Sequence, residues 1–182
     1  MKVRRRWRWV ERGALVVTLI VYISAYWDPF EIGRSVSRSY LFTYENIAAY
    51  ADMAGDPNPL HHDTAFAAGS RFGGVIASAA HSTGVLVSVL ADKFSKNGGA
   101  VGLGFTFTLR RAVKAGASTD LVWTVAAVYR SEKLSGIVVE LTGETRDRET
   151  DQVYLMAKGR MLLIGEAEIS AAARGRLETR ST

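Results

Sequence analysis

The spacing of hydrophobic and polar positions changes near residue 100, and the change divides the chain into a helical part and a strand-rich part. Before it, the pattern predicts a short strand at Val36–Phe42, a helix from about Tyr44 through Met53, and an apolar, small-residue stretch from Val75 to Phe94. After it, apolar and polar positions alternate in four predicted strands, at about Ala100–Ala112, Ser118–Arg130, Gly136–Asp147 and Gln152–Ile164.

The stretch from Val75 to Phe94 lacks a polar face over most of its length, which predicts a helix that is buried nearly all round. Such a helix needs a cover, and the four alternating strands can supply one. We therefore expect an α+β fold in which an antiparallel sheet curls around a long central helix. A chain of 182 residues that is 48% hydrophobic suits one such core rather than two.

The chain carries a formal net charge of +5, but this charge lies at its amino end. Residues 1–12 contain six basic residues and one acidic residue, whereas the rest of the chain contains 17 of each kind. Nucleic-acid binders gain much of their affinity by neutralising phosphates, so a neutral domain argues against a nucleic-acid partner. The absence of cysteine from the sequence excludes disulfides, thiolate nucleophiles and thiolate metal sites.

Residues 1–26 form a separate zone with a basic start. The apolar run from Ala14 to Trp27 has fourteen residues, fewer than the roughly twenty of a membrane-spanning helix. Three interpretations stay open: a membrane-associated segment, a β-rich segment packed on the domain, and an extension from a start codon placed too far upstream. We expect the domain at residues 27–165, a frayed or loosely helical tail at residues 166–182, and a cytoplasmic protein whose membrane contact, if any, is through residues 1–26.

The stretch from Asp56 to His61 concentrates the candidate chemistry, because it holds an acid, an amide and an imidazole among two prolines. Pro57 and Pro59 fix φ and make the residues before them poor helix formers, so the preceding helix should end near Gly55. A stiff loop would then project Asp56 and His61 in fixed directions, as acid–base catalysis requires. Taken alone, Asp56 also fits an Asx turn and His61 a surface loop histidine.

Two runs of residues at a set distance are more specific than either alone. They are Gly-Asp-Pro-Asn-Pro-Leu-His at residues 55–61 and Phe-Gly-Gly-Val-Ile-Ala at residues 72–77. Together they resemble the signature of MaoC-like dehydratases and R-specific enoyl-CoA hydratases, over roughly residues 27–164. The resemblance implies the hot-dog fold, a long helix wrapped by an antiparallel sheet, with subunits paired through their sheets into homodimers or larger homo-oligomers.

The resemblance also implies a lyase without cofactor or metal, which reversibly hydrates trans-2-enoyl thioesters of CoA or acyl-carrier protein to (R)-3-hydroxyacyl thioesters. Asp56 would take a proton from a water that His61 orients, and His61 would handle the proton delivered to the α-carbon. The charge that builds on the thioester oxygen needs a preset donor, and the amino end of a buried helix is one. We expect the Ala79 backbone N–H to donate, Ser78 to lie beside it, and Asn58 to hold the loop in place.

Three positions depart from the family pattern. Ala54 replaces the small hydroxyl residue or glycine that is usual before the Gly-Asp pair. Ala79 stands where many members have Gly, and Ala80 stands where relatives often carry a bulky residue, so Ala80 is expected to widen the pocket. None of these changes removes the acid or the imidazole. The departures therefore concern substrate range and turnover more than reaction type.

Three nearby residues have more ordinary interpretations. His62 should point away from the site, His81 should be a hydrogen-bonded core histidine, and Asp63 should cap a helical turn at residues 64–68. A metal site made of His61, His62, Asp63 and His81 is the weaker alternative, because this congested loop offers only nitrogen and oxygen ligands.

Two other functions stay open. A hot-dog acyl-CoA thioesterase would use a carboxylate and a water but would not need the run at residues 55–61. A non-catalytic, acyl-binding subunit of a heteromeric dehydratase would not need both Asp56 and His61. Release of free thiol, rather than a change in enoyl absorbance, would favour the thioesterase.

Overall fold

The computed structural model describes residues 30–94, 99–165 and 178–181. Five long strands form one sheet in the order β1-β3-β4-β5-β2, and each neighbouring pair is antiparallel. The long strands that the alternating pattern predicted are confirmed, with small shifts at their ends. In chain order the elements are β1 (Ser35–Leu41), α2 (Tyr44–Ala54), η1 (Pro59–His61), α3 (Thr64–Gly69), α4 (Ala79–Phe94), β2 (Ala100–Leu109), β3 (Ser118–Ser131), β4 (Gly136–Asp147), β5 (Val153–Leu163) and β6 (Thr179–Arg180).

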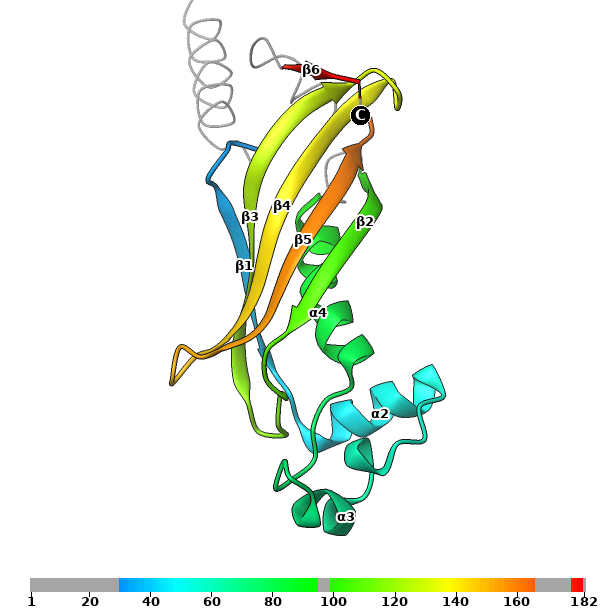
Figure 1. Ribbon diagram of the computed structural model, residues 1–182, viewed down its shortest axis with the longest axis vertical. Helices are drawn as coiled ribbons and strands as arrows, with labels where there is room; N and C mark the ends of the chain where they lie inside the picture. Colours follow the sequence, from blue (N-terminus) through cyan, green and yellow to red (C-terminus); the bar gives the residue numbers. More distant parts are fainter. Residues whose placement is uncertain (1–29, 95–98, 166–177, 182) are drawn as a thin grey trace, which may run out of the picture.

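Helix α4 runs along one face of the sheet and forms the main core with it (Figure 1). Leu86, Val89 and Leu90 of the helix are fully buried against apolar side chains from the strands. Trp123 of β3 is also fully buried, and its indole N–H donates to the Leu86 carbonyl oxygen over 2.7 Å. This arrangement, a long helix covered by a curled antiparallel sheet, is the hot-dog fold.

Two glycines let aromatic side chains lie flat against the inner face of the sheet. Gly143 is paired with Trp123, and a Cβ at Gly143 would lie 2.7 Å from Cε3 of that indole. Gly159 is paired with Phe105, and a Cβ there would lie 2.7 Å from Cε1 of the Phe105 ring. Any side chain at either position would displace a ring from the core.

One side of α4 is more open than the sequence pattern predicted. His81, Leu86 and Leu90 are buried, but Ala79 and Ala91 are exposed, and several positions between them are only half-buried. A single sheet covers one side of a helix, so the remaining side lies open in one subunit. The expectation of burial nearly all round is therefore wrong for the single chain.

Helices α2 and α3 lie beyond one end of the sheet (Figure 1) and cover a second, smaller core. Thr43 caps α2 through a capping box with Asn46. Gly55 ends the helix with φ of +67°, as the sequence predicted. Asp63 caps α3, which confirms its predicted role. The second core contains Phe42, Ile47, Ala67, Val75, Ala77 and Val113.

The described end of the tail is ordered rather than frayed. Thr179 and Arg180 form β6, which pairs in parallel with β3, and the Arg180 guanidinium lies 4.3 Å from the centre of the Tyr129 ring. The predictions for residues 1–26 lie outside the described residues. Among the residues that are described, no helix combines the length and apolar character needed to cross a membrane.

Candidate active site

The loop after α2 takes its shape from its own side chains. One carboxylate oxygen of Asp56 accepts from the Asn58 N–H over 3.1 Å, which forms an Asx turn. The Asn58 side chain accepts from the Leu60 N–H over 3.1 Å and caps the 3₁₀ turn η1. Asn58 therefore shapes the loop, and Asp56 has its second oxygen, Oδ2, free to face His61.

His61 is held by a backbone carbonyl that sequence reasoning missed. Its Nδ1 lies 2.7 Å from the Ile76 carbonyl oxygen, and the Ile76 N–H in turn donates to the Leu60 carbonyl. A carbonyl can only accept, so Nδ1 carries a proton. The contact fixes the ring and leaves Nε2 facing the site. A backbone acceptor of this kind leaves no signal in side-chain identities.

Asp56 and His61 face each other, as the loop chemistry predicted. Asp56 Oδ2 lies 3.5 Å from His61 Nε2, while the His61 side chain is 6% exposed and the Asp56 side chain 36% exposed. The Asx turn and the pairing with His61 use different oxygens of the same carboxylate. The Asx turn at Asp56 is therefore compatible with the approach of its other oxygen to His61.

The amino end of α4 lies at the same site. Ser78 precedes the helix, and its hydroxyl accepts from the His81 N–H over 3.1 Å, so it caps the first turn. The N–H groups of Ala79 and Ala80 have no acceptor among the described residues. They are thus two unsatisfied donors at the positive end of the helix dipole.

One pocket of about 670 Å³ contains all five of the predicted site residues. Apolar side chains make up much of the remaining wall, and two arginines lie at its edge, which the sequence interpretation did not include. These are Arg110 and Arg111, and their position side by side near the end of a predicted strand was the feature of the sequence that could have indicated them. The lining comprises Asp56, Asn58, Leu60, His61, Phe72, Ile76, Ala77, Ser78, Ala79, Ala80, Ser82, Leu109, Arg110, Arg111, Ala112 and Val113.

His81 is the core histidine that the sequence predicted. It is 1% exposed, its Nε2 lies 3.1 Å from the Tyr40 hydroxyl, and its ring stacks on Tyr50 at 4.5 Å. Burial lowers the pKa of His81, and the charge of the nearby His61 lowers this pKa further. His81 is therefore a neutral packing residue behind the site.

His62 does more than the sequence interpretation allowed. Its Nε2 lies 2.8 Å from the Asp56 backbone oxygen, and its Nδ1 lies 3.7 Å from the Asp52 carboxylate. It therefore ties the loop to α2 rather than standing apart. No group of three or more His, Asp or Glu side chains suited to a metal ion occurs in the part of the chain that the structure describes.

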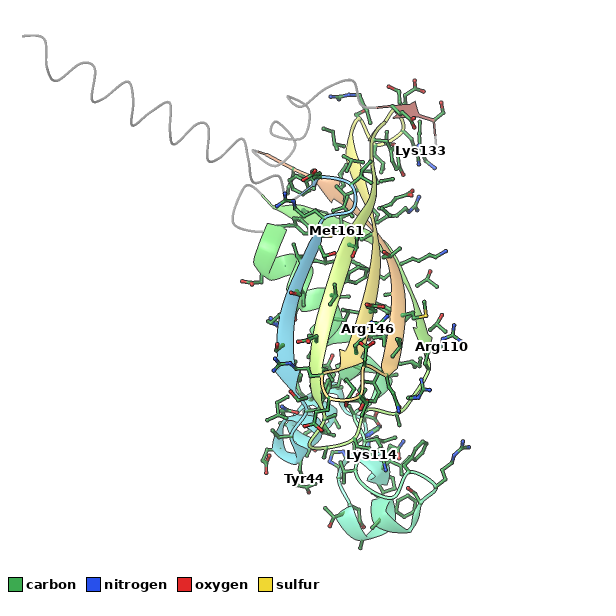
Figure 2. The ribbon with its side chains drawn as sticks, turned by 90° about the vertical axis from the view of Figure 1, so that its left-hand side faces the viewer. Tyr44, Arg110, Lys114, Lys133, Arg146 and Met161 are labelled. Atoms are coloured by element: carbon green, nitrogen blue, oxygen red, sulfur yellow. The ribbon has the colours of Figure 1, made fainter. Side chains whose placement is uncertain are left out.

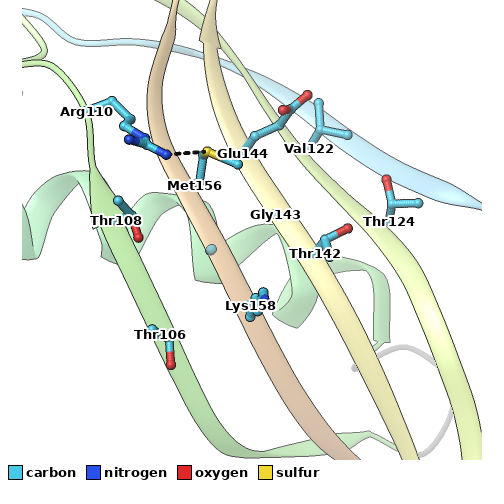
Figure 3. Close-up of a pocket in the computed structure, with 11 residues that line it drawn as sticks. Thr106, Thr108, Arg110, Val122, Thr124, Thr142, Gly143, Glu144, Met156 and Lys158 are labelled. Atoms are coloured by element: carbon cyan, nitrogen blue, oxygen red, sulfur yellow. Dashed lines mark hydrogen bonds between the residues drawn. The ribbon is translucent and has the colours of Figure 1, made fainter.

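A groove lies on the outer face of the sheet, the face away from α4, and differs from the Asp56–His61 pocket in its lining (Figure 3). Threonine hydroxyls from β2, β3 and β4 line it together with Lys158, and it has no acid–imidazole pair. Arg110 lies at its edge, where its guanidinium is 3.7 Å from the Met156 sulfur. Arg110 is the one residue that this groove shares with the Asp56–His61 pocket.

The fold and the site together define a hot-dog protein with a carboxylate and an imidazole beside the amino end of its central helix. A family model described as "MaoC like domain" matches residues 29–145. The chain belongs to this family, as its two sequence runs indicated. The matched residues lie within the predicted domain of residues 27–165.

Individual relatives are distant. A 3-hydroxybutyryl-CoA dehydratase from Methylorubrum extorquens is 28% identical over 101 residues, which cover 56% of this chain and 64% of that protein. An R-hydratase from Pseudomonas aeruginosa has a TM-score of 0.66 at 20% identity, covering 75% of this chain and 83% of its own. The (R)-hydratase from A. caviae has a TM-score of 0.65 at 23% identity, covering 75% of this chain and 99% of its own. These two structures show a shared fold.

Proposed function

We propose that the protein is a hydro-lyase that adds water reversibly to trans-2-enoyl thioesters and forms (R)-3-hydroxyacyl thioesters. The observation that carries the proposal is the 3.5 Å approach of Asp56 Oδ2 to His61 Nε2 inside a largely apolar pocket. Family membership and the dehydratase relative support the same reaction class.

The hydrogen-bond directions at this pair favour a shared water. Because His61 Nδ1 donates to Ile76, Nε2 of the neutral ring is an acceptor, and it faces the acceptor Oδ2 of Asp56. Two acceptors need a donor between them, and one water supplies two hydrogens. Atoms 3.5 Å apart can both lie about 2.8 Å from a single water oxygen.

In the proposed reaction, the water oxygen bonds to the β-carbon while Asp56 takes one of its protons. The electrons of the double bond move through the thioester carbonyl to give an enolate. Asp56 passes the water proton to His61 Nε2, and His61 delivers it to the α-carbon, so both groups return to their starting state. The net change is one water added, and the reverse path is dehydration.

The enolate oxygen is proposed to lie at the amino end of α4. In this proposal the Ala79 N–H donates a hydrogen bond to the enolate oxygen, and the Ala80 N–H lies beside it. Both N–H groups are unsatisfied among the described residues, and both residues line the pocket. Ser78 serves by capping the helix and thus fixing these two amides. Preorganised donors of this kind stabilise developing charge without reorganisation.

The acyl group is carried by CoA or by a carrier protein in this proposal, and the protein acts as a homodimer or larger homo-oligomer. Strand β2 supports the assembly, since it lies at one end of the strand order and pairs with β5 on one side only.

The proposal is tested by incubating the purified protein with crotonyl-CoA. Hydration predicts loss of the enoyl absorbance, formation of (R)-3-hydroxybutyryl-CoA by chiral analysis, and no free thiol. Release of coenzyme A would support the thioesterase instead. A protein that leaves enoyl thioesters of several chain lengths unchanged would contradict the lyase assignment.

A further inference from the structure

The rim of the Asp56–His61 pocket is basic where β2 ends. Arg110 and Arg111 follow the last residue of that strand, and both line the pocket and are exposed. Asp56 is the one acidic residue in the lining, and it faces His61 inside the pocket. The rim therefore presents two positive charges to solvent over an interior with one negative charge.

These two guanidinium groups are weakly engaged. Arg110 contacts the Met156 sulfur at 3.7 Å, and Arg111 donates to the Val153 carbonyl over 3.1 Å. Neither has a carboxylate within ion-pair distance among the described residues, whereas Arg34 and Arg146 are each paired with a glutamate. Arginines without a counter-charge beside a pocket are free to bind an anion.

The two arginines lie where the regular pairing of β2 ends, because their backbone N–H groups both donate to the Tyr154 carbonyl oxygen. Arg110 continues the outward row of Thr106 and Thr108, and Figure 3 shows it on the outer face beside Met156. Arg111 lines the Asp56–His61 pocket together with Leu109. Figure 2 shows Arg110 at the margin of the sheet. A group that leaves the pocket over this rim therefore passes both Arg110 and Arg111.

We propose that Arg110 and Arg111 bind phosphate on the carrier of the thioester substrate, an inference that rests on the proposed function. The thioester lies at Asp56 and His61, so the carrier arm must leave through the mouth of the pocket. Both candidate carriers hold phosphate on that arm, as the single phosphate of phosphopantetheine or the further phosphates of CoA. Guanidinium groups match phosphate oxygens in charge and geometry.

The test compares three crotonyl thioesters: pantetheine without phosphate, phosphopantetheine with one, and CoA with the nucleotide phosphates added. Wild-type protein should have a lower KM for the phosphate-bearing substrates. In the double variant Arg110→Gln/Arg111→Gln, the ratio of the pantetheine KM to the CoA KM should fall by about tenfold or more. The matched control Arg130→Gln/Arg160→Gln removes the same charge from exposed strand positions outside this pocket and should keep the wild-type ratio.

Comparing the KM values of neighbouring substrates in this series identifies which phosphate the arginines bind. If the arginine variant loses the KM difference between the pantetheine and phosphopantetheine thioesters, the arginines bind the phosphate that CoA and carrier proteins share. If it loses the KM difference between the phosphopantetheine and CoA thioesters, they bind a phosphate of the nucleotide. An unchanged ratio in the arginine variant, or an equal fall in the control, overturns the proposal.

A binding titration with coenzyme A separates this proposal from the lyase assignment, because it needs no turnover. The arginine variant should bind coenzyme A about tenfold or more weakly than the wild type, with thermal unfolding showing both to be folded. If wild type hydrates nothing yet this difference is present, only the lyase assignment fails. If hydration is present and the affinities are equal, only the phosphate site fails.

Discussion

Replacing Ala79 by proline tests the proposed oxyanion donor with little change elsewhere. Ala79 is the first residue of α4, and the first helical position is where proline is best tolerated, because its N–H has no partner within the helix. The variant Ala79→Pro removes one of the two unsatisfied donors of this turn and leaves the cap from Ser78 to His81 in place. We therefore expect a change in unfolding free energy below about 1 kcal/mol.

The effect on catalysis should be much larger. Removal of one oxyanion donor typically lowers kcat by about a hundredfold to a thousandfold, or about 3–4 kcal/mol of transition-state stabilisation. The assay is steady-state hydration of crotonyl-CoA, with thermal unfolding as the check on folding. Ala79→Val is the control, because it adds comparable bulk at the pocket wall but keeps the N–H. If the proline and valine variants lost kcat equally, bulk would explain the effect and the Ala79 N–H would not be the donor.

Three further predictions concern stability and titration. Gly143→Ala should destabilise the fold by about 1–3 kcal/mol in denaturant unfolding, because the added Cβ would lie 2.7 Å from the fully buried Trp123 indole. The control Gly104→Ala should be tolerated, because its Cβ would meet nothing within 4 Å. Equal losses of stability in the two variants would refute this reasoning. The pKa of His81 is lowered in the folded state, so the unfolded chain takes up this proton at a higher pH than the folded protein does. The free energy of unfolding should therefore fall as the pH drops below about 6.5. The variant His81→Leu should show a shallower fall, and an unchanged slope would contradict the prediction. The Tyr154 hydroxyl lies 2.7 Å from the Asp147 carboxylate and is the main cause that lowers the pKa of Asp147 to about 2. The stability that this carboxylate contributes should therefore be lost as the pH falls towards about 2. The variant Tyr154→Phe should raise the pKa of Asp147 in an NMR titration, and an unchanged pKa would exclude the contact.

The fold was largely readable from the sequence because its elements are strongly patterned. Alternation marked the long strands, and the two prolines after Gly55 marked the end of α2. The openness of α4 could not be read in this way. An apolar, small-residue helix has the same composition whether its own sheet or another subunit covers it. The residues at 83–85, 87 and 88 therefore gave no warning that they would be only half-buried.

The candidate site was predictable in its side chains but not in its backbone. Two prolines indicated a stiff loop that projects Asp56 and His61, and the family resemblance implied that the two side chains share a water; the structure brings them within 3.5 Å. The Ile76 carbonyl that fixes His61 comes from a segment that reaches the loop only through tertiary pairing, and any residue type there would offer the same oxygen. The contact of His62 with the Asp56 backbone depends likewise on where the chain turns back.

The most direct test of the central claim is a double-mutant cycle of Asp56→Asn and His61→Ala on kcat/KM for crotonyl-CoA hydration. If both groups act on one water, each single variant should lose about a hundredfold or more while remaining folded. The double variant should then lose little beyond the worse single variant, because the second group has no activated water left to act on. Losses that multiply in full, or wild-type rates in either single variant, would contradict a shared water at Asp56 and His61.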